Sequence, residues 1–157
     1  MKFVFNLQKL MDLREKFMEM AKEELAKKIQ ERIKVEKMIE EIKIKIDDFE
    51  ADFNTQLQNS ITTSKFQQLI QYREFLDSER KKLIKIYSIK LKEEQLARED
   101  YIEAKKEKDI LDKLKERKHE DFMYELKTSE IQEMDEIAQK IYARNSKLDS
   151  DKNNDKK

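Results

Sequence analysis

The sequence predicts an all-α protein, a long two-helix antiparallel coiled coil that forms a helical hairpin. Charged residues make up 45% of the 157-residue chain, and neither glycine nor proline occurs. Because these two residues normally make chain reversals, their absence indicates few turns and long uninterrupted elements. The abundant Lys, Glu, Leu, Ile and Ala are mostly good helix formers. Disorder competes as an explanation of the high charge, but eight Phe, five Tyr and regularly spaced aliphatic residues argue against it.

The first predicted arm covers residues 3–57. Its second half carries an apolar residue every three or four positions, the heptad pattern of a coiled-coil seam. These residues are Val35, Ile39, Ile42, Ile46, Phe49, Phe53 and Leu57. The first half continues less regularly through Leu7, Leu10, Phe17, Ala21 and Leu25. We interpret the change of phase between the halves as a stutter in one helix.

One segment, residues 54–64, reads as a chain reversal. Its sequence NTQLQNSITTS is rich in residues whose side chains compete for backbone groups and favour caps and turns. Ser64 followed by Gln67 fits a capping box, which predicts that a second helix starts there.

The second predicted arm covers residues 65–144. Its apolar stripe contains Leu69, Leu76, Leu83, Tyr87, Ala97, Tyr101, Ala104 and Leu111. Lys108, Lys115 and Lys118 lie at or near this stripe, so the seam is loose there. Both arms belong to one coiled-coil domain, residues 1–144. The polar segment 145–157 that follows is expected to be a disordered tail.

The two arms differ in length, which poses a problem of pairing. If pairing starts at the reversal, Phe3 lies opposite about His119, and arm two overhangs beyond that point. The overhang retains apolar residues that an isolated helix does not normally expose, so a partner is expected. These residues are Phe122, Leu126, Ile131, Ile137 and Ile141. Alternatively, short connecting helices within residues 54–75 take up the extra length.

Charge is balanced over the whole chain but not along it. With 35 basic and 35 acidic residues, the net charge of zero gives no general attraction to nucleic acid or an anionic membrane. Residues 105–118 hold seven bases and four acids, whereas residues 120–136 hold seven acids and one base. This arrangement is either a solvated face with pairs such as Glu136–Lys140, or a docking end. The lack of cysteine, signal peptide and apolar span predicts a cytoplasmic protein.

Catalytic and ligand-binding chemistry finds no support in the sequence. Two helices side by side form no dry pocket, and the chain has no glycine for a phosphate loop and no cysteine nucleophile. Glu116 and His119 make half of a di-metal motif, but no second histidine exists to complete it. Asp47, Asp48 and Asp52 lack the glycine of a calcium loop. We therefore expect no enzyme activity, metal, cofactor or small-molecule substrate.

Aromatic residues gather around the predicted reversal. They are Phe49, Phe53, Phe66, Tyr72 and Phe75. Phe49 and Phe53 are in phase with the seam and are expected to seal the tip of the hairpin. Five aromatics exceed what one face of two helices can bury, so some should be exposed as a protein contact.

The two ends and the middle of the chain resemble the FliJ family of flagellar type III export proteins over about residues 3–144. FVFNLQKLMDLRE resembles the family's opening F-x-LQ-x-L-x-x-L-R-E, and the segment from Tyr72 to Phe75 is also similar. The C-terminal match consists of Lys105 and Lys108, Leu111 and Leu114, Glu116-Arg117-Lys118, and Asp135-Glu136-Ile137-Ala138.

This resemblance implies a non-enzymatic stalk, similar to the γ-subunit stalk of rotary ATPases. Such a stalk binds the hexameric export ATPase through the end that holds the termini, promotes its assembly and activity, and also contacts the membrane export gate and export chaperones. It is cytoplasmic and associates peripherally with the inner membrane at the flagellar base. The ATPase contact would fall on Leu7, Leu10, Arg117, Phe122, Asp135, Glu136, Ile137 and Ile141. The gate contact would fall on Phe49, Phe53, Tyr72 and Phe75.

Two other functions fit the same pattern. A prefoldin-like or secretion chaperone would hold clients along the loose seam between residues 108 and 118. A purely structural coiled coil would self-associate. A stalk of a virulence-type injection system is a close variant of the first hypothesis.

Overall fold

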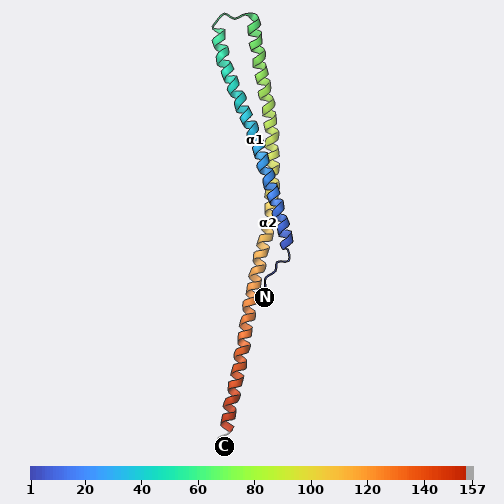
Figure 1. Cartoon of the computed structure of the whole chain (residues 1–157), viewed down its shortest axis with the longest axis vertical. Coiled ribbons are helices and arrows are strands. Elements are labelled where there is room, and N and C mark those ends of the chain that lie inside the picture. Colours follow the sequence, from blue (N-terminus) through green and yellow to red (C-terminus); the bar gives the residue numbers. More distant parts are fainter. Residues whose placement is uncertain (155–157) are drawn as a thin grey trace. The chain divides into compact units, whose positions relative to one another are not determined.

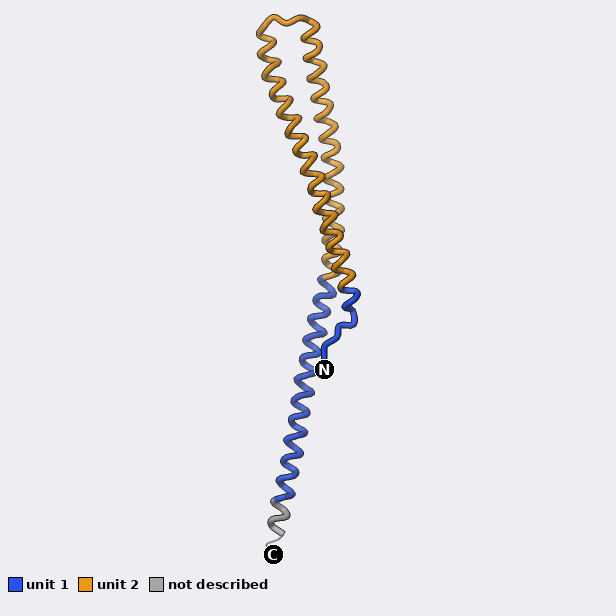
Figure 2. The backbone as a smooth tube through the Cα atoms, viewed as in Figure 1, with its two compact units in different colours: residues 1–11, 109–157 blue, residues 12–108 orange. Residues whose placement is uncertain are grey.

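A computed structural model describes the backbone of residues 1–154 and the side chains of residues 1–148. Two helices account for nearly all of it: α1 (Gln8–Leu57) and α2 (Thr63–Asn154) (Figure 1). Within this described part there is no strand, and the predicted all-α helical hairpin is confirmed. The chain divides into two compact units, residues 1–11 with 109–157 and residues 12–108, which we call the terminal unit and the hairpin unit (Figure 2).

The hairpin unit is held together by the predicted seams of both helices. On α1, Leu25, Val35, Ile42 and Phe49 are buried, and on α2, Leu76 and Ala97 are buried. Its largest cluster joins Ile42, Phe49 and Leu76, with Ile46, Phe53, Leu69 and Leu83 packed around them. The heptad spacing places these side chains on the facing stripes of the two helices, where their burial stabilises the coil.

The stutter predicted between the two halves of the first arm is wrong. Counting back from Val35 in steps of three and four leads to Arg32, Lys28, Leu25, Ala21, Met18 and Arg14, and all six are buried or half-buried. The seam therefore runs unbroken, with cations at three of its positions. Four residues that we assigned to the seam are exposed instead: Leu7, Leu10, Phe17 and Leu57.

The reversal falls inside the segment 54–64, and no helix lies between α1 and α2. The alternative of short connecting helices is therefore wrong. The cap of α2 is Thr62, whose Oγ1 accepts a hydrogen bond of 3.2 Å from the backbone N–H of Lys65. Ser64 lies within the first turn of α2, so the predicted cap was placed two residues too late.

In the terminal unit, the chain begins with a short non-helical segment. The N–H of Gln8 donates to the carbonyl of Phe5 (3.0 Å), and α1 starts at Gln8 rather than at Phe3. Phe3 instead packs on α2, against His119 and Phe122. At the other end, α2 continues to Asn154, past Asn145, where we expected a disordered tail to begin. Residues 155–157 lie outside the described residues.

Candidate docking surfaces

Charged residues inside the hairpin unit form a network that fixes how its two helices pair. Glu94 of α2 is only 8% exposed. It accepts a hydrogen bond from Nε of Arg32 on α1 and another, of 3.1 Å, from Arg98 on its own helix. The bond from Arg32 is the main cause that holds the pKa of the Glu94 carboxyl below its ordinary value.

A second group of charges lies beside this pair. Lys90 of α2 donates to Glu31 of α1 (3.0 Å) and to Glu93 (3.1 Å), and Lys28 of α1 donates to Glu93 (3.3 Å). These hydrogen bonds lower the pKa of both carboxyl groups and raise the pKa of both lysines. Arg14 forms a further interhelical bond with Glu107. Because every such bond needs one particular pairing of residues, the network selects the register of the two helices.

The predicted aromatic cluster near the reversal does form. Phe49 stacks on Phe53 with ring centroids 5.7 Å apart and meets Tyr72 edge-on at 5.3 Å. Phe53 lies against Phe66 at 6.1 Å, and Tyr72 stacks on Phe75 at 6.4 Å. One aromatic layer thus connects the two helices across their facing sides.

Members of this cluster differ in what they can offer a partner. Phe49 is buried and Phe53 is half-buried, as expected of residues that seal the tip. Phe66, Tyr72 and Phe75 are exposed, so their faces are open to contact. Of the four residues predicted at the gate contact, Tyr72 and Phe75 can therefore touch a partner directly, and the buried Phe49 packs against Tyr72.

The terminal unit has a groove where its N-terminal segment lies along α2. The groove has a volume of about 750 Å³, and Phe3, Val4, Phe5, Leu114 and Phe122 are among its apolar lining residues. Next to it, Nζ of Lys115 donates to Oε1 of Gln8 (2.9 Å). Two predicted contact residues, Leu7 and Phe122, also line this groove.

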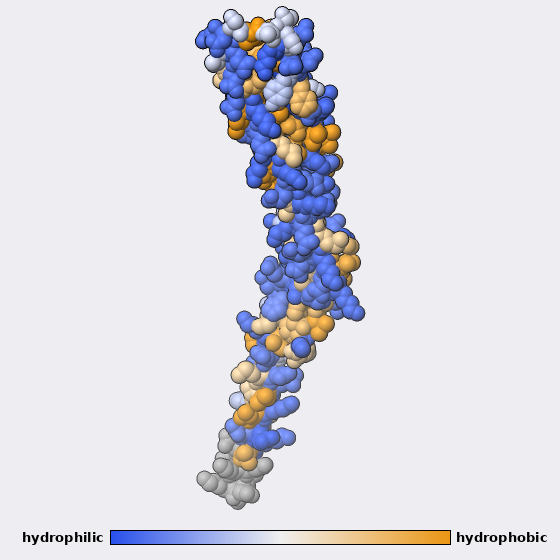
Figure 3. Space-filling view, turned by 45° about the horizontal axis from the view of Figure 1, so that its top comes forward, coloured by the Kyte–Doolittle hydropathy of each residue, from blue (hydrophilic) through white to orange (hydrophobic). Residues whose placement is uncertain are grey.

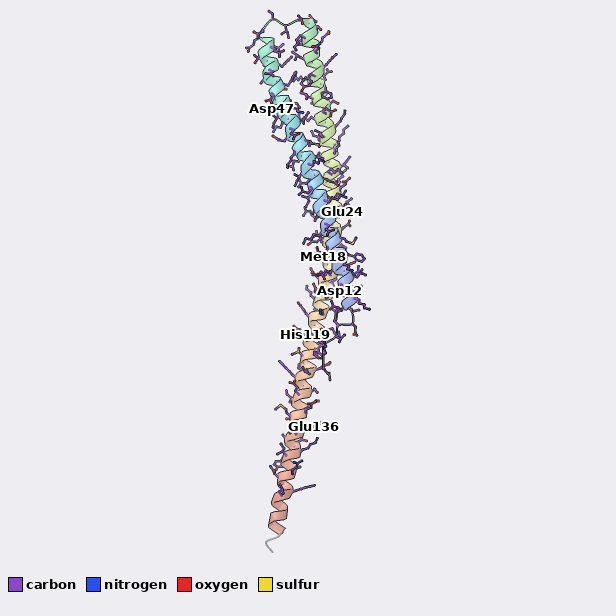
Figure 4. The ribbon with its side chains drawn as sticks, viewed as in Figure 1. Asp12, Met18, Glu24, Asp47, His119 and Glu136 are labelled. Carbon is purple, nitrogen blue, oxygen red and sulfur yellow. The ribbon has the colours of Figure 1, made fainter. Side chains whose placement is uncertain are left out.

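Beyond the groove, the C-terminal part of α2 is open to solvent. Every described side chain from residue 130 to residue 148 is exposed, and Figure 3 shows apolar residues at the surface near this end. The predicted contacts Ile137 and Ile141 are 56% and 54% exposed, and Arg117, Asp135 and Glu136 are exposed as well (Glu136 is labelled in Figure 4). The eight residues predicted at the ATPase contact are therefore all in the terminal unit.

The predicted ion pair of Glu136 with Lys140 is not formed among the described side chains. Asp135 and Glu136 thus present their charges outward. Within the described residues there is also no group of three or more histidine, cysteine or acidic side chains able to hold a metal ion. His119 instead contacts the ring of Phe3.

One row of exposed residues on this part of α2 was not predicted. Its members recur at spacings of three and four, and all but Asn145 are apolar; the exposed Ile137 and Tyr142 lie beside this row. We call this set the C-terminal stripe: Ile131, Met134, Ala138, Ile141, Asn145 and Leu148. The spacing could have been found by extending the heptad count through Ala138 and across the polar boundary at Asn145.

Comparison with known proteins identifies the family. Neither of the two helices, over the part of the chain that the structure describes, is apolar enough along its length to cross a membrane. No curated protein and no solved structure matches the chain. The profile of the flagellar FliJ protein family matches residues 2–147, which covers all of α1 and most of α2. This chain therefore belongs to the FliJ family and is a component of the flagellar protein export apparatus.

Proposed function

We propose that this protein is a non-enzymatic stalk that docks on the hexameric flagellar export ATPase through its terminal unit. Docking would promote assembly of the ATPase ring and couple its activity to the membrane export gate. The protein would act on the cytoplasmic side of the inner membrane, at the flagellar base.

One observation carries this proposal: an apolar face on α2 that no other described part of the terminal unit covers. Ile137 and Ile141 lie on it, and both are more than half exposed. Exposed apolar faces of this kind, bordered by charge, commonly mark contacts between proteins. A helix is also narrow enough to contact several subunits around the inner surface of a ring.

Charge beside this face gives the docking a direction. Residues 130–136 hold four acids and no base, and residues 137–148 hold three bases and no acid. An ATPase surface with the opposite order of charges would be attracted in one orientation and repelled in the other. Small differences in contact around the ring would favour the assembled hexamer over its free subunits.

The aromatic cluster of the hairpin unit is the proposed contact for the export gate. Tyr72 and Phe75 expose adjacent stacked rings, and exposed aromatic residues are the commonest energetic centres of protein interfaces. Export chaperones would be further partners of the same apparatus.

The direct test is to titrate purified export ATPase with this protein and to follow both hydrolysis and oligomer size. We expect hydrolysis to rise and the hexamer to form at lower ATPase concentration. If neither quantity changes, the stalk function is excluded.

A pair of variants locates the contact. Reversing two charges by Asp135→Lys with Glu136→Lys should weaken ATPase binding roughly tenfold or more and leave helix content unchanged. The matched control is Glu99→Lys with Asp100→Lys, which reverses another exposed pair of adjacent acids on α2, in the hairpin unit. Equal loss of binding in both variants would show a general charge effect and not a local docking role.

The gate contact is tested separately with Tyr72→Ala and Phe75→Ala. Both should reduce binding to the cytoplasmic part of the gate and leave ATPase stimulation intact. Loss of both activities together would instead indicate damage to the hairpin.

A further inference from the structure

The C-terminal stripe is not a continuation of the seam that packs the N-terminal segment on α2. In the terminal unit that seam runs through Leu111, Lys115, Phe122, Leu126 and Ser129, which are all buried or half-buried. Extending it from Ser129 in steps of four and three gives Glu133, Glu136, Lys140, Ala143 and Lys147, of which only Ala143 is apolar. The stripe lies one to two residues away from these positions, which places it about 150° around the helix. It therefore suits a partner other than the protein's own first arm.

Its composition is that of a short coiled-coil seam. Ile131, Ala138 and Asn145 occupy one core position of the heptad, and Met134, Ile141 and Leu148 occupy the other. Ala138 and Ile141, at the centre, combine a small and a large side chain. In an antiparallel pair each core position faces the other kind, so Ala138 and Ile141 would fill one another's space.

The charges around the stripe favour the same arrangement. Glu130, Glu133, Asp135 and Glu136 lie in its first half. Lys140, Arg144 and Lys147 lie in its second half. Antiparallel pairing of two identical helices brings the acidic half of one next to the basic half of the other, whereas parallel pairing places acids beside acids.

From these observations we propose that the protein self-associates through its C-terminal stripe, with α2 of one copy antiparallel to α2 of a second copy. The two-fold axis lies between Ala138 and Ile141. Ala138 then faces Ile141 of the second copy, and Ile131 faces Leu148 of the second copy. A parallel pair would gain an Asn145–Asn145 contact, but it would also place the four acids of each helix side by side.

Sedimentation of the full chain, without ATPase, tests whether the pair exists. Over a range of about 1 to 500 µM we expect a shift from monomer to dimer, because a contact of fewer than three heptads is weak. Ile141→Glu should move this shift to at least tenfold higher concentration. Ala143→Glu, which adds the same charge on the other side of the helix, should leave it nearly unchanged. A single monomeric species throughout, or equal effects of the two variants, would overturn the proposal.

Spin labels distinguish the two orientations. The chain has no cysteine, so Glu125→Cys and Gln139→Cys each provide one unique labelling site, and both occupy the same outward heptad position. An antiparallel pair predicts about 20 Å between the two copies' labels at residue 139 and about 45 Å at residue 125. A parallel pair predicts short distances at both sites and would overturn the antiparallel assignment.

The self-association surface and the proposed ATPase contact share Ile141 on α2, but the two are tested separately. Self-association is measured on this protein alone, so a monomer would leave the ATPase and gate contacts untouched. If the protein dimerises but does not stimulate the ATPase, the self-association stands and the proposed stalk function fails.

Discussion

The ring of Phe3 meets the imidazole of His119 edge-on, with centroids 5.1 Å apart and planes at 89°. This contact ties the non-helical N-terminal segment to α2 in the terminal unit. It also agrees with the prediction, made by counting along the two arms, that Phe3 lies opposite His119.

Replacing Phe3 should release that segment without unfolding the helices. Phe3→Ala removes the contacts with His119 and Phe122, but the side chain is only half-buried, so the cost should be about 1 kcal/mol, below that of a core aromatic. We expect faster amide hydrogen exchange in residues 1–7 and a shift of the His119 ring proton resonances. Phe17→Ala, which truncates an exposed phenylalanine, is the control and should change neither.

Removing one partner of the Arg32–Glu94 pair should be worse than removing both. Arg32→Leu leaves the buried carboxylate with one partner fewer, and Glu94→Leu leaves the guanidinium without its buried acceptor. Each should lower the thermal midpoint by roughly 5 °C, while the double variant should recover most of the loss because apolar residues fit a coiled-coil seam. A thermal melt of the four proteins gives the coupling. Additive losses would mean that the pair does not act as a unit.

The charged network predicts stability that falls at both extremes of pH. Glu31, Glu93 and Glu94 have folded-state pKa values below the ordinary 4.5, chiefly because lysine or arginine donates hydrogen bonds to them. Their contribution is complete above that pH and is lost as the pH falls through the lowered values. For Lys28 and Lys90 the pKa is raised above 10.5, so their contribution is complete below that pH and is lost above the raised values.

Urea unfolding measured between pH 2 and pH 12 checks this profile, which should be flat between about pH 5 and pH 10. Glu94→Gln should reduce the acid-dependent part and leave the alkaline part in place. An unchanged acid limb in Glu94→Gln would contradict the assigned role of the carboxylate.

Two neighbouring residues near the tip should separate stability from binding. Leu76 is the most buried side chain described, at 3% exposure, whereas Phe75 is exposed. We expect Leu76→Ala to cost about 2–3 kcal/mol of unfolding free energy and Phe75→Ala less than about 1 kcal/mol, measured by urea unfolding. A large loss of unfolding free energy in Phe75→Ala would show that the ring stabilises the hairpin and is not reserved for binding a partner.

How much of this structure the sequence could predict depended on which residues occupy the seam. Where the seam is apolar, from Val35 to Phe53, the heptad count identified every core position. Where Arg14, Lys28 and Arg32 take core positions, a count of apolar residues alone suggested a change of phase that does not exist. Those cations can be recognised as core residues only when their acidic partners on α2, Glu93, Glu94 and Glu107, are known. The pattern within one helix does not reveal partners that lie 60 or more residues away in the sequence.

The candidate surfaces show the same limit. The aromatic cluster was found because its members are close in sequence to the reversal, but the exposure of Tyr72 and the burial of Phe49 depend on how the helices face one another. The non-helical start of the chain was not predicted because Phe3 and Phe5 can occur either within a helix or in an extended segment that packs against a helix.

Because α2 is a single helix that contains no glycine or proline, the offset between its two apolar faces has a rotational consequence. A partner bound to the C-terminal stripe is set at a fixed angle to the side of α2 that holds Phe3. Deleting Glu130 would turn that angle by about 100° while keeping every apolar residue of both faces. The number of residues between the two faces of α2 therefore sets the angle between a partner on the C-terminal stripe and the N-terminal segment.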